Sequence, residues 1–292
     1  MKPVVRLLCL ALCAALLLPC AAVCAEQAAF SFETDFSQES LGEAIERYLE
    51  SRGIRGKFFS VGWRDLTSGE EWYRGADLFM EGASTYKLPL CMLYADRVAA
   101  GEIAREDKIG AYTVETAVRD ALVISSNNAA DALRRGVSEN HVEYRTAIAA
   151  SCSLPLEELP SGYYTANQFS PRCLIGTLQT LWDGREGKYD WIVAYMTEAQ
   201  PESFISRWRG EYEVAHKTGN ALGYISDTGV VFAERPFLLT VMTYGLDDAE
   251  TVIAGIARIA MDYAEYLAAQ PEPAADRLPE PVPENRAEGE RT

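Results

Sequence analysis

The sequence predicts a mixed α/β (α+β) fold, in which helices flank one antiparallel sheet and an all-helical subdomain is inserted over about residues 90–205. Two observations predict this class. Segments with the alternating pattern of β-strands lie near both ends of the chain, and segments with helical periodicity lie between them. Strands from distant parts of the chain must therefore meet in one sheet.

The first 25 residues have the pattern of a signal peptide. A short positive region with Lys2 and Arg6 precedes an apolar run, and small residues precede an expected cleavage site after Ala25. We therefore expect a secreted chain, periplasmic or extracellular and associated with the cell envelope. Its mature part begins with an extension over residues 26–39. A lipoprotein modified at a cysteine of the leader is the alternative.

One domain is expected over residues 40–270, and it begins with a helix and a hairpin. The segment "SLGEAIERYLE" (40–50) has Ser40 as a helix cap, Glu43 three residues later and apolar residues at helical spacing. The segment 57–77 alternates, turns at a Thr-Ser-Gly sequence and alternates again, which predicts a hairpin.

Helices are expected in the middle of the chain. The first begins at Ser84 and ends near Gly101. A second helical segment over 113–135 is interrupted by the polar run "SSNN", and two further helices are expected over 165–183 and 189–199.

The last part of the domain returns to strands. Three short β-rich segments, over 212–219, 225–234 and 237–245, are separated by turn-forming residues. A helix over 247–270 with an acidic start closes the domain. The Pro- and Glu-rich segment 271–292 is too polar to form a core and is expected to be a disordered acidic tail.

The charge of the chain argues against a nucleic-acid partner. The 292 residues carry a formal net charge of −16, and the pI is about 4.7. Nucleic-acid binding needs a basic face that replaces counterions, and the sequence has no stripe of Lys and Arg.

The cysteines and histidines do not predict a metal site. Four of the seven cysteines lie in the predicted signal peptide. Cys91 lies in an apolar helical segment and is expected to be a buried thiol. Cys152 and Cys173 could pair in an oxidising compartment, but the sequence leaves this open. Since no His and Cys residues have the spacing of metal ligands, neither a metal nor another cofactor is expected.

The stretch "GASTYKLPLCMLY" (82–94) places Ser84 and Lys87 on one face of the expected helix. A serine hydroxyl needs an adjacent base to act as a nucleophile. A lysine becomes such a base when burial and nearby positive charge lower its pKa. Taken alone, the pair is more often a surface feature, because Ser-x-x-Lys occurs by chance in many proteins.

A second motif, Ser125-Ser126-Asn127, lies in the break of the second helical segment. The Ser125 hydroxyl could relay a proton to a leaving group, and the Asn127 amide could hold a substrate carbonyl. In isolation, a polar turn that ends a helix is the favoured interpretation.

A third motif, Lys217-Thr218-Gly219, lies at the end of a predicted strand. Lys217 and Thr218 could bind an anionic group such as a carboxylate. Gly219 would let a substrate backbone lie against the strand edge, and the backbone N–H of Asn220 could help to form an oxyanion hole. A turn between strands is the alternative interpretation of this motif alone.

The order and context of the three motifs are more specific than any one of them. They occur as S-x-x-K, S-x-N and K-T-G, at a helix start, an inter-helix turn and a strand end. The sequence therefore resembles the serine hydrolase superfamily of class A β-lactamases and penicillin-binding proteins. The resemblance covers about residues 40–268 and includes the blocks "ISSNNAADAL" (124–133) and "AHKTGNALGYISDTGVVF" (215–232). It implies a β-lactamase/transpeptidase-like fold.

The resemblance also implies roles for the motif residues. Ser84 would attack a β-lactam or peptide carbonyl and form an acyl-enzyme, Lys87 would take its proton, and Ser125 would pass a proton to the leaving nitrogen. The implied substrate is a small β-lactam or a D-Ala-D-Ala-type peptide, and the implied enzyme is a monomer. The substrate-binding residues would be Asn127, Lys217, Thr218, Gly219 and Asn220.

The sequence departs from the class A pattern at the residue that activates water for deacylation. Class A enzymes carry a Glu in an E-x-x-L-N loop, which activates the water that cleaves the acyl-enzyme. The corresponding region, "LEELPSGYYTANQFSP" (156–171), has Glu157 and Glu158 too close to Leu159 to match, and Pro160 stands where Asn belongs. Slow deacylation is therefore expected.

Three functions remain open on the sequence. The first is a secreted serine hydrolase of class A β-lactamase type. The second is a D,D-peptidase or penicillin-binding-type protein that is acylated but deacylates slowly. The third is a non-catalytic binding or sensor domain, which the intact motif residues disfavour. A Ser-His-Asp hydrolase is poorly supported, because Ser84 lacks a G-x-S-x-G elbow and His216 is expected to be a strand residue beside Lys217 and not a base.

Overall fold

The structure is a computed structural model, and the described residues exclude both ends of the chain and several short internal segments. The predicted signal peptide and all but the first residue of the predicted tail lie outside them. The described residues are 32–56, 58–137, 146, 148–152, 155–158, 167–200 and 202–271.

The central element is a five-stranded antiparallel sheet in the order β2-β1-β9-β8-β7. The N-terminal hairpin pairs with the C-terminal strands through β1 and β9, with Val61 opposite Val241. This confirms that strands from both ends of the chain form one sheet, and it leaves β7 at an edge. The strands are β1 (Phe59–Asp65), β2 (Glu71–Arg74), β7 (Glu213–Ala221), β8 (Tyr224–Phe232) and β9 (Phe237–Tyr244).

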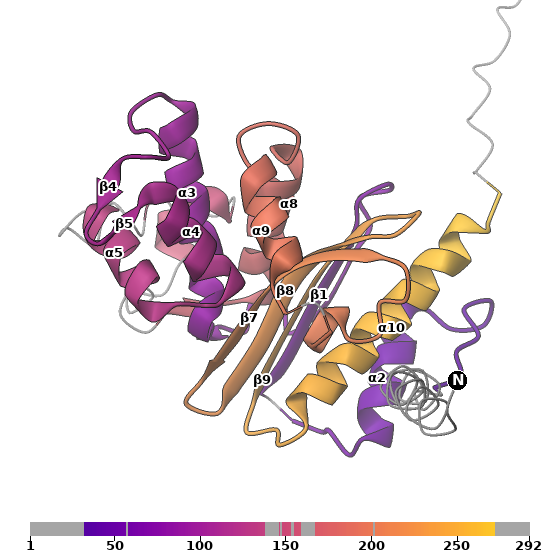
Figure 1. Ribbon diagram of the computed structural model, residues 1–292. Coiled ribbons are helices and arrows are strands. Elements are labelled where there is room, and N and C mark those ends of the chain that lie inside the picture. Colours follow the sequence, from indigo (N-terminus) through magenta and orange to yellow (C-terminus); the bar gives the residue numbers. More distant parts are fainter. Residues whose placement is uncertain are drawn as a thin grey trace, which may run out of the picture.

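Helices cover both faces of the sheet (Figure 1). One face carries the first and last helices of the domain, α2 (Leu41–Ser51) and α10 (Ala249–Ala268). The other face carries the middle helices, of which α8 packs directly on β1, β8 and β9. The middle helices are α3 (Lys87–Ala99), α4 (Val114–Val123), α5 (Asn127–Val137), α8 (Pro171–Asp183) and α9 (Asp190–Glu198).

The sheet separates two hydrophobic cores. On β9, Leu239 and Val241 face the core that contains α2 and α10, whereas Leu238 and Met242 face the core of the middle helices. This alternation follows from the period of two of a β-strand, and it explains why β9 is buried on both faces. Gly62 on β1 allows α8 to approach, since a Cβ there would lie 2.8 Å from Ile175 Cγ1.

The first helix begins where the sequence predicts. The Glu43 N–H donates to Ser40 Oγ at 3.3 Å, and the Ser40 N–H donates to Glu43 Oε2 at 2.8 Å. This reciprocal pair is a capping box, which satisfies backbone N–H groups that have no partner inside the helix.

Two helix starts differ from the prediction. Ser84 lies in a 3₁₀ turn, η1 (Ala83–Tyr86), and α3 begins only at Lys87. The helix expected from residue 165 begins at Pro171, because β6 (Gln168–Phe169) instead pairs with β3 (Met80–Glu81).

Four further short elements complete the described part of the chain. They are β4 (Lys108–Ile109), β5 (Tyr112–Thr113), η2 (Leu156–Glu158) and η3 (Phe204–Ser206). Among the described residues, no helix is both long enough and apolar enough to cross a bilayer.

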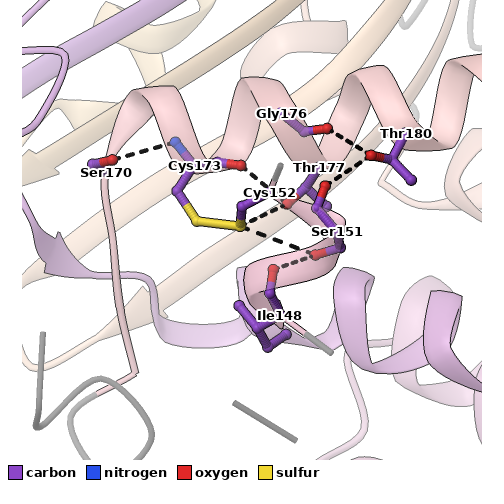
Figure 2. Close-up of a disulfide and its surroundings, with 8 residues drawn as sticks. All are labelled: Ile148, Ser151, Cys152, Ser170, Cys173, Gly176, Thr177 and Thr180. Atoms are coloured by element: carbon purple, nitrogen blue, oxygen red, sulfur yellow. Dashed lines mark hydrogen bonds between the residues drawn. A yellow bond between two sulfur atoms is a disulfide. The ribbon is translucent and has the colours of Figure 1, made fainter. Parts of the chain in front are cut away.

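A disulfide joins Cys152 to Cys173 and settles the pairing that the sequence leaves open (Figure 2). Cys173 lies in the first turn of α8. The Thr180 hydroxyl of the same helix donates to the Ser151 carbonyl at 2.8 Å, as Figure 2 shows. Gly176 lets the two segments touch, because a Cβ there would lie 2.1 Å from the Cys152 carbonyl oxygen. The segment around Cys152 is thereby fixed to the helix that packs on the sheet.

Replacing Cys152 and Cys173 together by serine is expected to lower the free energy of unfolding by about 3 kcal/mol. The cross-linked residues are 21 apart in sequence, and their bond restricts the unfolded chain. The melting temperature should fall by about 6–12 °C. Thermal unfolding with and without reductant provides the measurement, and the reduced wild type should match the double variant. Equal melting temperatures for all samples would contradict this expectation.

Candidate active site

The fold brings the three sequence motifs together. Ser84 and Lys87 come from η1 and the start of α3, Ser125 comes from the turn between α4 and α5, and Lys217 comes from the edge strand β7. Hydrogen bonds of 3.2 Å or less link the side chains of these four residues in one chain.

The Lys87 amine lies at the centre of this arrangement. Its side chain is fully buried. Nζ lies 3.0 Å from Ser84 Oγ, 2.6 Å from the Ser125 carbonyl oxygen and 2.8 Å from Asn127 Oδ1. All three atoms can accept hydrogen bonds, so they replace the water that burial removes from the amine.

The surroundings of Lys87 suit a neutral amine as well as an ammonium. Burial lowers the pKa of Lys87 to about 8. A neutral amine has two N–H donors, which match Ser125 O and Asn127 Oδ1, and one lone pair, which can accept the Ser84 hydroxyl proton. The geometry therefore allows Lys87 to act as the base toward Ser84.

Ser125 connects the two lysines. Its Oγ lies 3.2 Å from Lys87 Nζ and 3.0 Å from Lys217 Nζ. Its backbone has a φ of 54°, in the left-handed region that non-glycine residues rarely adopt. The bond from Lys87 to the Ser125 carbonyl holds this conformation, so the turn and the lysine fix each other.

Lys217 is also buried, and its ionisation is coupled to that of Lys87. Burial and the positive charge of Lys87 together lower the pKa of Lys217 to about 7. Nζ also donates to the Thr218 carbonyl at 2.8 Å. Two buried amines that share one serine hydroxyl therefore titrate as a pair near neutral pH, and the amine that has lost its proton can act as a base.

Ser126, between the two motif residues of the turn, has a structural role. The Ala129 N–H donates to Ser126 Oγ at 3.2 Å, in the manner of a helix N-cap. Asn127 begins α5, and its amide oxygen faces Lys87. The second serine of "SSN" therefore starts the helix that carries Asn127.

The turn before Ser84 is held by Asn167 and Glu81, two residues that sequence reasoning missed. Ala83 has a φ of 47°. Its carbonyl accepts from Asn167 Nδ2 at 2.5 Å, and its N–H donates to Glu81 Oε1 at 3.1 Å. Burial raises the pKa of Glu81. These bonds fix the backbone immediately before Ser84, and only the pairing of β3 with β6 brings Asn167 here.

Gly219 lies against this same turn. A Cβ at Gly219 would lie 2.4 Å from the Gly82 carbonyl oxygen and 3.1 Å from the Ser84 backbone nitrogen. The close approach that requires glycine is thus to the protein's own backbone. Asn220, the next residue, is exposed on the edge strand.

Thr218 contacts a residue that has no motif signal. Its hydroxyl donates to Gln200 Oε1 at 2.9 Å. Gln200 follows α9 and has a φ of 40°. No periodicity or spacing in the sequence indicates this contact, because Gln200 is an isolated polar residue in a loop.

His216 is a buried structural residue, in agreement with its interpretation from sequence. Nδ1 lies 2.7 Å from Asp227 Oδ2, and Nε2 lies 2.8 Å from the Ala199 carbonyl oxygen. Burial lowers the pKa of His216, but the Asp227 carboxylate outweighs it and the net shift is upward. Since both ring nitrogens face acceptors, His216 is a donor on both sides and is not a base for Ser84.

Among the described residues, none directly replaces the missing Glu. Glu157 and Glu158 are exposed in η2, and residues 159–166 lie outside the described part of the chain. Within the described residues, no carboxylate is hydrogen-bonded to Ser84 or Lys87, and no three His, Cys, Asp or Glu side chains form a metal-binding group.

The comparison with protein families identifies one match over most of the chain. A model of the "Beta-lactamase enzyme family" matches residues 40–264. Among proteins with curated descriptions, none matches the chain.

Solved structures with the same fold carry related descriptions. The beta-lactamase from Sphaerobacter thermophilus has a TM-score of 0.66 and 22% sequence identity, covering 80% of this chain and 99% of that one. An ancestral class A beta-lactamase has a TM-score of 0.65 and 20% identity, covering 77% and 100%. PBP-A has a TM-score of 0.63 and 17% identity, covering 76% and 96%. At these identities the matches show the fold, which is the fold that the sequence motifs imply.

Proposed function

Because the chain belongs to the beta-lactamase enzyme family, we propose that it is a serine hydrolase of class A type that opens β-lactams through an acyl-enzyme on Ser84. One observation supports this more than any other. Ser84 Oγ lies 3.0 Å from the buried Lys87 amine, whose pKa is lowered to about 8. A nucleophile and a base with a pKa near the working pH are the two requirements of the first step.

In the acylation step, Lys87 takes the Ser84 proton as Oγ attacks the lactam carbonyl. Collapse of the tetrahedral intermediate breaks the C–N bond, and Ser125 gives its hydroxyl proton to the leaving nitrogen. Lys87, 3.2 Å from Ser125 Oγ, returns the first proton to Ser125. These proton transfers leave an ester on Ser84 and return Lys87 and Ser125 to their starting protonation states.

Binding and charge stabilisation use the edge strand. Lys217 and Thr218 would hold the substrate carboxylate, and Asn127 would hold its amide carbonyl. The backbone N–H groups of Ser84 and Asn220 would stabilise the oxyanion, and each such donor contributes about 3 kcal/mol in comparable sites. The approach of β7 to the Ser84 backbone supports this assignment.

Slow deacylation is the second candidate behaviour. Neither Glu157 nor Glu158 is placed near Ser84 by any described contact, and both are exposed. An acyl-enzyme without a water-activating carboxylate persists. The protein would then behave as a penicillin-binding protein or a D,D-peptidase acting on a D-Ala-D-Ala-type peptide. A non-catalytic binding domain is the third candidate, and the intact chain of hydrogen bonds around Ser84 disfavours it.

Incubation with benzylpenicillin is expected to add one equivalent of penicilloyl mass to the wild-type protein and none to Ser84→Ala. Mass spectrometry of the intact protein and of its peptides locates the adduct. Loss of Ser84 removes the attacking atom while the neighbouring groups remain, so the acylation rate should fall at least about 1000-fold.

The time course with a chromogenic cephalosporin distinguishes the candidates. Sustained turnover that is lost in Ser84→Ala supports the β-lactamase. A burst that stops at one equivalent supports the slowly deacylating protein and rejects the β-lactamase. The absence of an adduct with several β-lactams would reject both.

The two buried lysines are expected to titrate as a pair, in steps at about pH 7 and about pH 8. The acylation rate constant at low substrate should rise about tenfold per pH unit below about pH 7, because Lys87 must lose its proton to act as a base. It should be highest between these two steps, where the pair keeps one proton, and fall above about pH 8, where the charge that holds the substrate carboxylate on Lys217 is also lost.

Lys217→Arg provides the control, since arginine keeps its charge over this range. This variant should retain the rise and lose the fall at high pH. Stopped-flow acylation at fixed ionic strength gives both profiles. A rate that is flat from pH 6 to 8 would exclude Lys87 as the base.

We also propose that the enzyme acts outside the cytoplasm. The signal-peptide pattern of residues 1–25 and the Cys152–Cys173 disulfide both support this, because disulfides persist in oxidising compartments. Expression in a bacterial host should give a periplasmic or secreted protein whose mass corresponds to a chain that starts at Glu26. A cytoplasmic full-length chain with free thiols at Cys152 and Cys173 would contradict the proposal.

A further inference from the structure

Gln200 lies beside the middle of β7, where the structure places Lys217 and Thr218, because β7 continues to Ala221 and does not end at this motif as the sequence predicts. Its carboxamide oxygen accepts the Thr218 hydroxyl at 2.9 Å, across 18 residues of sequence. Gln200 is exposed and Thr218 is half-buried, so this contact lies at the surface, one residue along β7 from the buried Lys217.

The backbone of Gln200 is fixed in a conformation that a flexible loop would not keep. Its φ of 40° lies in the left-handed region, which non-glycine residues rarely adopt. Three donors hold its carbonyl oxygen: the Ser203 N–H at 3.3 Å, Ser203 Oγ at 3.0 Å and Ser206 Oγ at 2.9 Å. The strain persists because the surroundings determine this geometry.

His216, two residues before Thr218 on β7, also connects this loop to the strand. Its Nε2 donates to the Ala199 carbonyl at 2.8 Å and lies 3.3 Å from the Gln200 carbonyl oxygen. Its Nδ1 is paired with the fully buried Asp227 at 2.7 Å. Asp227 also accepts the Ile205 N–H at 3.0 Å. The loop that carries Gln200 is thus anchored to the strand that carries Thr218.

The carboxamide of Gln200 keeps unused donors. A glutamine side chain has one acceptor oxygen and two N–H donors. The oxygen is taken by Thr218, whereas Nε2 donates to no protein atom among the described residues. The exposed part of β7 at Thr218 therefore has hydrogen-bond donors from two elements, the Thr218 hydroxyl on β7 and Gln200 Nε2 after α9. Such a set suits an anion.

We propose that Gln200 is a specificity-determining residue whose Nε2 donates a hydrogen bond to the carboxylate of the substrate. The inference rests on the proposed function, in which Lys217 and Thr218 hold that carboxylate. When the carboxylate binds, the Thr218 hydroxyl turns from Gln200 Oε1 to the substrate, and the carboxamide donates to the same group.

The alternative role is structural: Gln200 would only accept the Thr218 hydroxyl and hold it in place. Two isosteric variants separate the roles. Gln200→Glu keeps the acceptor, removes both donors and adds a negative charge. Gln200→Met removes acceptor and donors without adding charge. Gln38→Glu adds the same charge at an exposed position three residues before α2, the helix that packs in the other core, and serves as the control.

The experiment compares acylation rate constants for benzylpenicillin and for its methyl ester, which lacks the negative charge. The preference for the acid over the ester should fall about 100-fold in Gln200→Glu and about 10-fold in Gln200→Met, because hydrogen bonds to charged groups are among the stronger ones. The rates with the ester should change by less than about threefold, and Gln38→Glu should behave as the wild type. Thermal unfolding verifies that each variant is folded.

Two results would overturn the inference. If Gln200→Glu keeps the wild-type preference for the acid over the ester, only the acceptor oxygen of the Gln200 side chain matters. If Gln200→Met keeps this preference and only Gln200→Glu loses it, the loss is due to charge repulsion, and Gln200 has no donor role.

A binding measurement separates this inference from the proposed function. Calorimetry on Ser84→Ala, alone and combined with Gln200→Met, measures the affinity for the acid and the ester without acylation. If the wild type forms no adduct, the proposed function fails, but a lower affinity for the acid in the Gln200→Met background still supports the role of Gln200. Equal affinities in both backgrounds, or no binding by Ser84→Ala, would overturn it.

Discussion

The amine of Lys87 is held out of water between Ser84 and the turn that joins α4 to α5, and the other parts of the site are arranged around it. A buried ammonium without partners is expensive, so the chain must supply acceptors from other elements. It supplies the hydroxyl of Ser84, the carbonyl of Ser125 and the amide oxygen of Asn127. The same acceptors that compensate for burial also align Lys87 with Ser84 and Ser125. Stability of the buried amine and proton transfer thus depend on one geometry.

A second buried lysine makes this geometry harder to keep. Lys217 lies on β7 and shares the Ser125 hydroxyl with Lys87, so two like charges meet in a dry region. Their repulsion favours the loss of a proton near neutral pH, which is the property a base requires. Only a rigid frame can hold them together. The frame is the sheet with a hydrophobic core on each face, and one of these cores contains the helix that carries Lys87 and the two helices that flank Ser125.

Three of the described non-glycine residues with positive φ lie in or beside the candidate site. Ala83 precedes Ser84, Ser125 belongs to the site itself, and Gln200 contacts Thr218, and all three have positive φ. Each is held by hydrogen bonds from another element: Asn167 holds Ala83, Lys87 holds Ser125, and Ser206 holds Gln200. The fold therefore imposes conformations that these local sequences would not choose alone.

The sequence by itself determined the fold class, the approximate elements and the motif residues that line the site. Apolar periodicity and the spacing of Ser84 and Lys87 are local properties, and they can be recognised without knowledge of the tertiary structure. The break at "SSNN" and the capping box at Ser40 belong to the same category. The start of α8 could not be read in this way, because a two-residue strand such as β6 has no periodicity and forms only where β3 offers a partner.

The tertiary structure decided which groups meet and how they ionise. The Asn167 side chain reaches the Ala83 carbonyl across 84 residues, and the Gln200 side chain reaches the Thr218 hydroxyl of β7 across 18. It also decided the Cys152–Cys173 pairing and the contact that makes Gly219 necessary. Such contacts leave no pattern in the sequence, because a loop side chain bonds to whatever the folded backbone places beside it. The lowered pKa values of Lys87 and Lys217 likewise arise only when packing removes water from both amines.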